Sequence, residues 1–361
     1  MYYFCTYFDN HYLPKGMALY QSLKQQCPSF QLWILCMDRV CYEVLFKLKL
    51  PNVHLIPLED LEAGDEELLR AKENRSLIEY YFTCTPSLPL FIFDRHPEVD
   101  HITYLDADLF FFNSPIPLYD EIGIHSITII EHRFPPHLRD NSEKYGIYNV
   151  GWISFKRDEH ALACLQWWRE QCIEWCYDRV EDGRFADQKY LDTWPDRFSG
   201  VVVLRHKGAN LAPWNVSNYM IRKDMGRVWV DEQPLIFFHF HGLKKMNAWL
   251  YNHNLAIYRV KLSLSVLRSI YAPYIATLLN VSQELLPFFK QDSPDSNIRY
   301  STMESASFQQ TPLLRRIATS LSWRVDLCRE ILARNYLVVV NGRVLWLPVT
   351  TSASCTCSDN D

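Results

Sequence analysis

Hydrophobic and polar positions in the first 110 residues follow two alternating patterns. Short apolar runs rich in aromatic and branched residues, which are typical of strands, occur at 2–7, 30–37, 53–57 and 102–105. Apolar positions three or four apart, which predict helices, occur at 15–25, 40–47 and 66–82. Strands and helices that alternate in this way predict an α/β fold with a mostly parallel sheet covered by helices on both faces.

After residue 125 the hydrophobic pattern is mixed, with some stretches typical of a helix and others typical of strands. It predicts a helix at 159–177 and strands at 127–130, 152–155, 201–204 and 235–239. Residues 258–289 are rich in Leu, Ile and Tyr and poor in acids, which predicts a helical stretch that breaks at Pro273.

Changes in composition divide the chain into five expected segments. The first is one large α/β domain over 1–255, and a helical carboxyl-terminal extension follows over 256–290. The others are a polar, serine-rich linker over 291–311, an amphipathic helix with a carboxyl-terminal segment over 312–350, and a disordered tail over 351–361.

Composition and charge narrow the class of protein. Hydrophobic residues make up 48% of the 361 residues and charged residues 22%, which is the balance of a soluble globular protein. A net charge of −5 argues against a broad nucleic-acid-binding surface, so no nucleic-acid partner is expected. Eleven cysteines without a paired framework suit a reducing compartment, and no basic leader precedes the first strand, so we expect a cytoplasmic protein.

The arginine-bearing helix predicted at 312–335 leaves two interpretations open. It packs on the preceding domain, or it docks the protein peripherally on the inner face of an anionic membrane.

Carboxylates follow three of the predicted parallel strands. Asp9 comes after the first strand, Asp38 after the second, and Asp106 with Asp108 after the strand at 102–105. In parallel sheets, ligands bind at the edge formed by the carboxyl ends of the strands. Two charges flanked by apolar runs are costly to bury without a cation, so Asp106 and Asp108 predict a metal site with oxygen ligands.

A second group of candidate ligands lies at 237–245. This stretch holds His239, His241, Gly242 and two lysines that end at Lys245. An imidazole at a strand end can complete a carboxylate site and favours manganese over magnesium. A lysine close by can neutralise a phosphate, so the site is expected to hold a diphosphate as well.

Five short motifs occur in order between residues 104 and 245. They are Y-L-D-A-D at 104–108, N-x-G at 149–151, D-Q-x-x-L at 187–191, W-N at 214–215 and H-x-x-G-x-x-K at 239–245. Together they resemble the motifs of GT-A glycosyltransferases, most closely those of the retaining enzymes of glycosyltransferase family 8. The resemblance implies a Rossmann-like twisted sheet and assigns nucleotide-sugar binding to 1–255.

The resemblance also implies a role for each matching residue. Asp106, Asp108 and His239 are implied to hold Mn²⁺ (or Mg²⁺). Lys245 is implied to contact the diphosphate. The uridine pocket is implied to include Thr6, Asp9 and Asn10. The transferred sugar is implied to face Asn149, Gly151, Asp187 and Gln188, with Gln188 on its reactive side.

The sequence departs from the family pattern in two places. The arginine expected in the helix before the D-x-D motif is absent, and the nearest one, Arg75, lies about two turns earlier. The Pro-Trp pair expected after the last lysine is replaced by residues 246–249, Met-Asn-Ala-Trp. The chain is therefore expected in family 8 or in a close relative of it, and His241 competes with His239 as a ligand.

The expected function is transfer of a hexose from a UDP-sugar to a glycan or lipid-linked acceptor, as in polysaccharide biosynthesis. Retention of anomeric configuration is implied, with Gln188 assisting a front-side route or Asp187 a covalent one. An inverting GT-A transferase remains open, with Asp187 or Glu131 as base. A catalytically silent nucleotide-sugar-binding scaffold also remains open. The first loop, 6–11, lacks the glycine-rich, basic character of a nucleotidyltransferase.

Overall fold

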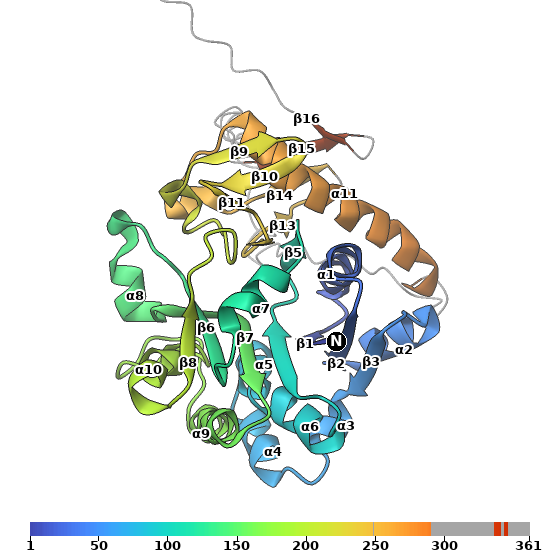
Figure 1. Ribbon diagram of the computed structural model, residues 1–361. Coiled ribbons are helices and arrows are strands. Elements are labelled where there is room, and N and C mark those ends of the chain that lie inside the picture. Colours follow the sequence, from blue (N-terminus) through green and yellow to red (C-terminus); the bar gives the residue numbers. More distant parts are fainter. Residues whose placement is uncertain (248, 290–335, 341–342, 346–361) are drawn as a thin grey trace, which may run out of the picture.

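A seven-stranded sheet runs through the centre of the protein (Figure 1). The computed structural model describes residues 1–247, 249–289, 336–340 and 343–345. In spatial order the strands are β3 (Val53–Pro57), β2 (Phe30–Cys36), β1 (Tyr2–Phe8), β4 (His101–Leu105), β7 (Tyr148–Lys156), β6 (Ile127–Glu131) and β8 (Val201–Leu204). β7 is antiparallel to β4 and β6, and the other neighbouring pairs are parallel. The predicted α/β fold with a mostly parallel sheet is confirmed.

Helices cover both faces of this sheet. In chain order they are α1 (Leu13–Gln26), α2 (Arg39–Leu48), α3 (Leu58–Glu62), α4 (Glu66–Glu73), α5 (Leu77–Cys84), α6 (Ser87–Arg95), α7 (Ile116–Ile122), α8 (Asp140–Tyr145), α9 (Glu159–Glu174), α10 (Trp194–Arg197) and α11 (Leu264–Phe289). Side chains of α1, α2 and the end of α11 share one core with the sheet, and α5, α6 and α9 share the other. Figure 1 shows α11 lying alongside α1.

The apolar runs predicted as strands are continuous because both faces of each strand are buried. In β2, Leu32 and Ile34 point to the core on the α1 side, and Trp33 and Leu35 point to the opposite core. Successive side chains of a strand point to opposite faces, so a strand buried on both sides needs apolar residues at every position.

Three smaller sheets complete the described fold. β5 (Leu109–Phe111) pairs antiparallel with β12 (Phe237–His239). β9 (Ile221–Asp224), β10 (Arg227–Val230) and β11 (Gln233–Pro234) form a second sheet. The third contains β13 (Lys244–Lys245), β14 (Leu250–Asn252), β15 (Tyr336–Val340) and β16 (Arg343–Leu345). The β5–β12 pair matters most for the site, because it joins the segment after β4 to a segment about 130 residues later.

Two helix predictions were wrong in detail. The single helix expected at 66–82 is two helices, because Ser76 begins a new one: its backbone N–H donates to Glu79 Oε2 at 2.8 Å in a capping box. The helical break expected at Pro273 is absent, and α11 runs through that residue. Its buried face, which includes Tyr271 and Tyr274, offsets the backbone hydrogen bond that proline cannot donate.

The carboxyl-terminal predictions lie mostly outside the described residues. The linker at 291–311, the helix at 312–335 with its membrane-docking interpretation, and the tail at 351–361 all fall there. By length and composition, α11 is apolar enough to cross a membrane. Half of its most apolar stretch is buried within the protein and it packs along α1, so we interpret it as a core helix.

The close approach of α1 to β1 gives the first prediction. A Cβ atom built on Gly16 lies 2.2 Å from the ring of Phe8, which is only 2% exposed and cannot move aside. We expect Gly16→Ala to destabilise the protein by about 1–3 kcal/mol through overpacking, despite the better helix propensity of alanine. Urea unfolding measures this, with Lys24→Ala in the same helix as the control. An unchanged or increased free energy of unfolding would contradict the tight packing of α1 on β1.

Candidate metal and sugar-nucleotide site

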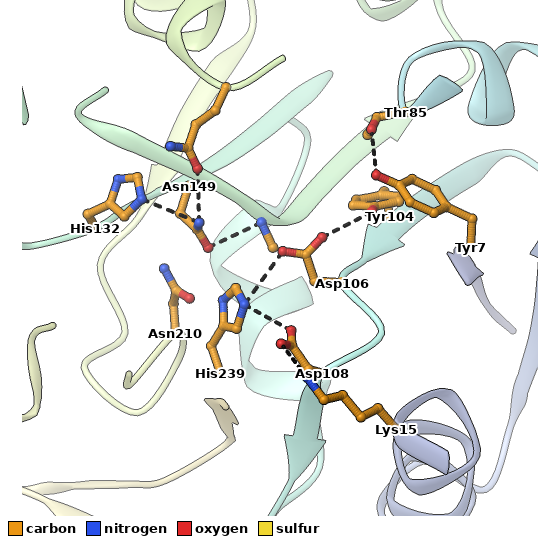
Figure 2. A network of polar contacts seen from close by, with 12 residues as sticks. Tyr7, Lys15, Thr85, Tyr104, Asp106, Asp108, His132, Asn149, Asn210 and His239 are labelled. Carbon is orange, nitrogen blue, oxygen red and sulfur yellow. Dashed lines mark hydrogen bonds and ion pairs between the residues drawn. The ribbon is translucent and has the colours of Figure 1, made fainter. Parts of the chain in front are cut away.

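Three metal-ligand side chains meet at the carboxyl edge of the sheet. Asp106 and Asp108 lie on the turn between β4 and β5, and His239 ends β12. His239 Nε2 is 3.0 Å from Asp108 Oδ1 and 3.6 Å from Asp106 Oδ2 (Figure 2). One ligand atom from each residue lies within 4.8 Å of the other two. The structure thus brings His239, rather than His241, to the two carboxylates.

Backbone hydrogen bonds fix these side chains in place. The Asp106 N–H donates to the Gly151 carbonyl at 3.2 Å, and the Phe240 N–H donates to the Asp108 carbonyl at 3.0 Å. The His239 N–H donates to the Leu211 carbonyl at 2.8 Å. The backbone positions of the three residues are therefore set by hydrogen bonds between neighbouring segments, which keeps the cost of ordering them low when an ion binds.

The donor set fits a divalent cation. The side chains of Asp108 and His239 are 9% and 4% exposed, so water screens them little. Burial, and repulsion by Asp108, raise the pKa of Asp106, against the attraction of His239. For Asp108, burial also opposes ionisation, but His239 and Lys15 outweigh it and hold the pKa below its usual range. Two carboxylates and one imidazole leave positions open for a diphosphate on an ion such as Mn²⁺.

Tyr104 orients one of the carboxylates. Its hydroxyl donates to Asp106 Oδ1 at 3.0 Å, so Oδ2 is the oxygen that faces His239. Hydrogen bonds of this kind to a ligand's second oxygen hold it in the geometry that a metal requires. The strand residue Tyr104 was noted in the sequence only as part of a motif.

Gly151 makes room for the imidazole. A Cβ atom at this position would lie 3.0 Å from His239 Nδ1 and 2.7 Å from Asn149 Oδ1. The Gly151 N–H donates to Asn149 Oδ1 at 3.1 Å, so the two residues of the N-x-G motif are linked directly. The motif therefore has a structural cause, which is close approach of the histidine ring to the backbone of β7.

A cavity of about 640 Å³ opens beside the three ligands. Asp106, Asn149, Asp187, Gln188 and His239 all contribute to its wall. Aromatic side chains form much of the remainder, namely Tyr7, Phe82, Phe134, Tyr145, Phe185, Trp214 and Tyr258. The volume suits a ligand of sugar-nucleotide size, and aromatic rings are suited to packing against sugar faces.

Two amides and an imidazole on the wall of this cavity contact one another in a row. Asn149 Nδ2 donates to Gln188 Oε1 at 3.1 Å and approaches His132 Nε2 at 3.4 Å (Figure 2). Gln188 Nε2 donates to the Tyr145 carbonyl at 2.8 Å. Burial lowers the pKa of His132 to about 3, so its ring is neutral and Nε2 can accept while Nδ1 faces the Ile147 carbonyl at 3.3 Å.

The sequence-based search missed His132. The residue directly follows β6, so it stands at a strand end like the carboxylates that were singled out. Extending the strand-end argument beyond the first half of the sheet finds it, although its contact with Asn149 depends on how β6 and β7 pair.

Asp187 is a buried acid on the cavity wall. Burial and the charge of Asp106 raise its pKa to about 7, against the opposing effect of a hydrogen bond from Thr85. Thr85 Oγ1 also lies 3.1 Å from the Tyr7 hydroxyl. Near neutral pH the residue is therefore present in both protonation states, and it can accept or release a proton.

The expected uridine residues lie beside the cavity and outside its described lining. Thr6 is fully buried in β1. Asp9 accepts from the Tyr12 N–H at 2.9 Å, and the Asn10 N–H donates to Asp38 Oδ2 at 2.7 Å. They sit together at the carboxyl end of β1, where a loop could bind a base.

Two lysines and an arginine, Lys245, Lys15 and Arg75, differ in their position relative to the site. Lys245 is exposed on β13 and is also outside the described cavity lining. Arg75 is tied to the end of α9 through the carbonyls of Ile173 and Glu174. Lys15, which the sequence did not single out, approaches Asp108 Oδ2 at 3.6 Å. Among the lysines and arginines of the part of the chain that the structure describes, the ion pair with these carboxylates thus comes from Lys15 on α1.

Two curated relatives are similar to the chain over most of its length. The uncharacterized protein YfnD of Bacillus subtilis (strain 168) is 32% identical over 295 residues, which is 80% of this chain and 92% of YfnD. The uncharacterized protein YfnF of the same organism is 35% identical over 248 residues, which is 67% of this chain and 81% of YfnF. No protein-family model matches the chain.

Solved structures with a similar backbone include two glycosyltransferases. The galactosyltransferase LgtC, in complex with donor and acceptor sugar analogues, is 16% identical with a TM-score of 0.43, over 66% of this chain and 87% of LgtC. Mouse xyloside xylosyltransferase 1 is 14% identical with a TM-score of 0.45, over 67% of this chain and 98% of that enzyme.

The space beside Gly151 gives the second prediction. We expect Gly151→Ala to displace the His239 ring and weaken Mn²⁺ binding by about tenfold or more, as changes beside metal ligands commonly do. Isothermal titration calorimetry on the purified protein measures the affinity. Ser154→Ala, a buried change in the same strand, is the matched control and should bind Mn²⁺ as the wild type does. Equal affinity of Gly151→Ala and the wild type would show that the β7 backbone does not hold the His239 ring in place.

Proposed function

The chain belongs to the same family as the Bacillus subtilis proteins YfnD and YfnF, and from the geometry of its site we propose that it is a metal-dependent glycosyltransferase. The proposed donor is a UDP-hexose and the proposed acceptor a glycan or lipid-linked glycan. The observation that carries the proposal is the cluster of Asp106, Asp108 and His239 beside a cavity of about 640 Å³.

The cluster and the cavity together favour sugar transfer over other reactions. Asp106 and Asp108 both lie within 4 Å of the His239 imidazole, at 3.6 Å and 3.0 Å, which is an arrangement typical of a metal centre. The two acids of a glycoside hydrolase instead stand on opposite sides of the scissile bond. The cavity wall combines amides with aromatic rings such as Trp214 and Tyr258, a combination suited to sugars.

The chain's own residues account for the steps proposed. Asp106, Asp108 and His239 would hold Mn²⁺, which would stabilise negative charge on the leaving diphosphate. The bond between the anomeric carbon and the diphosphate breaks as the acceptor oxygen bonds to the same carbon. The acceptor proton passes to the leaving diphosphate oxygen. Gln188, fixed by Asn149 and the Tyr145 carbonyl, presents its amide beside the anomeric carbon and stabilises the positive charge that develops there.

Lys245 and the uridine residues keep their proposed roles. Lys245 lies on an exposed strand three residues after Gly242, whose φ of +72° turns the chain sharply after β12. We propose that Lys245 contacts the diphosphate. Thr6, Asp9 and Asn10 are proposed to bind the uridine at the end of β1.

An inverting transferase is the second candidate, because one observation favours it. Burial raises the pKa of Asp187 to about 7, and a base with such a pKa can accept the acceptor proton directly. The anomeric configuration of the product separates the two routes. Retention supports the front-side role of Gln188, and inversion assigns the proton to Asp187.

The third prediction tests the transferase itself. We expect the wild type to release nucleotide from one UDP-hexose of a donor panel only when Mn²⁺ is present. Asp108→Asn removes a ligand charge while keeping the side-chain shape, so release should fall about a hundredfold or more. Asp94→Ala, a change of an exposed acid on α6, is the control and should retain full activity.

Two results would contradict the proposal. One is the absence of metal-dependent release and of metal-dependent nucleotide binding with every donor, which favours a scaffold. The other is full activity of Asp108→Asn in Mn²⁺, which would remove the carboxylate pair from the reaction.

A further inference from the structure

We propose that Lys15 is a switching cation of the site. In the absence of a metal its ammonium holds Asp108, and once a divalent ion has taken that carboxylate it binds the diphosphate of the donor. The second half of this inference rests on the proposed function, whereas the first half depends on metal binding alone.

The position of Lys15 in the fold carries the inference. It lies in the first turn of α1, directly after Pro14 and directly before the close contact of Gly16 with Phe8. The Lys15 side chain is only 17% exposed, and Nζ lies 3.6 Å from Asp108 Oδ2 (Figure 2). A lysine is rarely buried to this extent without a task for its charge.

The contact of Lys15 with Asp108 is loose. A charge-assisted N–H···O bond usually spans about 2.7–2.9 Å, and the distance between these two groups is 3.6 Å. The ammonium also lies over the ring of Tyr12, 4.1 Å from its centroid, and this ring is exposed at the edge of the site. A loosely held ammonium with three N–H donors can exchange one anion for another without a change in the backbone.

Lys15 and a metal ion compete for the same carboxylate. Asp108 Oδ1 faces the imidazole of His239 and Oδ2 faces the ammonium of Lys15, so both oxygens have a partner before any ion arrives. A divalent ion bound to Asp108 neutralises the charge that holds Lys15 and repels the ammonium. Lys15 therefore weakens metal binding to the free protein.

When a diphosphate is present, Lys15 favours metal binding instead of opposing it. Asp106 and Asp108 together carry two negative charges, which a divalent ion balances. The ammonium of Lys15 then gives the site a net charge of one positive unit. The diphosphate of a nucleotide sugar supplies an anion for it at the same edge of the sheet. Lys15 thus makes binding of the metal and binding of the nucleotide mutually favourable, as a coupling between the two sites.

The test measures two affinities of opposite expected change. Lys15→Met keeps the length and apolar stem of the side chain and removes its charge. In calorimetry without nucleotide, we expect it to bind Mn²⁺ about two- to fivefold more tightly than the wild type, the value of a partly exposed ion pair. At saturating Mn²⁺ we expect it to bind UDP about tenfold or more weakly, the loss of a charged hydrogen bond.

Two further variants serve as controls. Lys24→Met removes the other lysine of α1, which lies over the ring of Tyr20 at 5.8 Å, and should leave both affinities unchanged. Lys15→Arg keeps the charge and should restore UDP binding at least in part. Thermal unfolding shows whether each variant is folded, and Lys15→Gln replaces Lys15→Met if that variant is not.

Each outcome separates this inference from the proposed function. Weaker or unchanged Mn²⁺ binding by Lys15→Met overturns the competition with the metal. Unchanged UDP binding by the same variant overturns the diphosphate contact while the transferase proposal stands. A wild type that binds Mn²⁺ but no UDP overturns the proposed donor and the diphosphate contact together, and leaves the metal measurement as the test of the competition.

Discussion

The pairing of β5 with β12 is the constraint on which the site depends. It places His239 opposite Leu109, directly after the turn that carries Asp106 and Asp108. Without it, the two carboxylates at the end of a buried strand would lack the imidazole that lies between them, and only Tyr104 and Lys15 would face them. Because backbone hydrogen bonds set the positions of all three residues, the ligands are arranged before any ion binds.

The residues around the cluster hold its two carboxylates and its imidazole in position. Tyr104 holds one oxygen of Asp106, and Lys15 faces one oxygen of Asp108. The imidazole of His239 stands between the two acids, and Gly151 leaves it the space to do so. Burial makes each of these contacts stronger than it would be in water, and it makes an unpaired carboxylate correspondingly costly.

The sequence predicted the strands of the sheet and most helices of its first half, and it singled out Asp106, Asp108 and His239, which the structure brings together, because each of these features depends on local patterns or on strand ends. It predicted the ends of helices less well: the cap at Ser76 splits one expected helix, and the buried face of α11 overrides the break expected at Pro273. Lys15 and His132 were missed for a different reason. Their contacts with Asp108 and Asn149 join segments 93 and 17 residues apart, and only the packing of α1 and the pairing of β6 with β7 bring them together.

Proposed roles differ in how closely the structure supports them. Asn149, Gln188 and Asp187 share the wall of one cavity with the Asp106, Asp108 and His239 cluster, and this position supports the roles proposed for them. Thr6, Asp9, Asn10 and Lys245 do not belong to its described lining, and the roles proposed for them come from the family resemblance. The aromatic side chains of the cavity wall are suited to a sugar acceptor, and among them only Trp214 belongs to one of the motifs.

The most direct test of the central claim is anomalous X-ray scattering from crystals grown with Mn²⁺ and UDP. We predict one manganese peak within about 2.0–2.4 Å of oxygens of Asp106 and Asp108 and of His239 Nε2. A manganese peak elsewhere, or none at this cluster in crystals of protein that binds Mn²⁺ in solution, would contradict the assignment of these three residues as the metal centre.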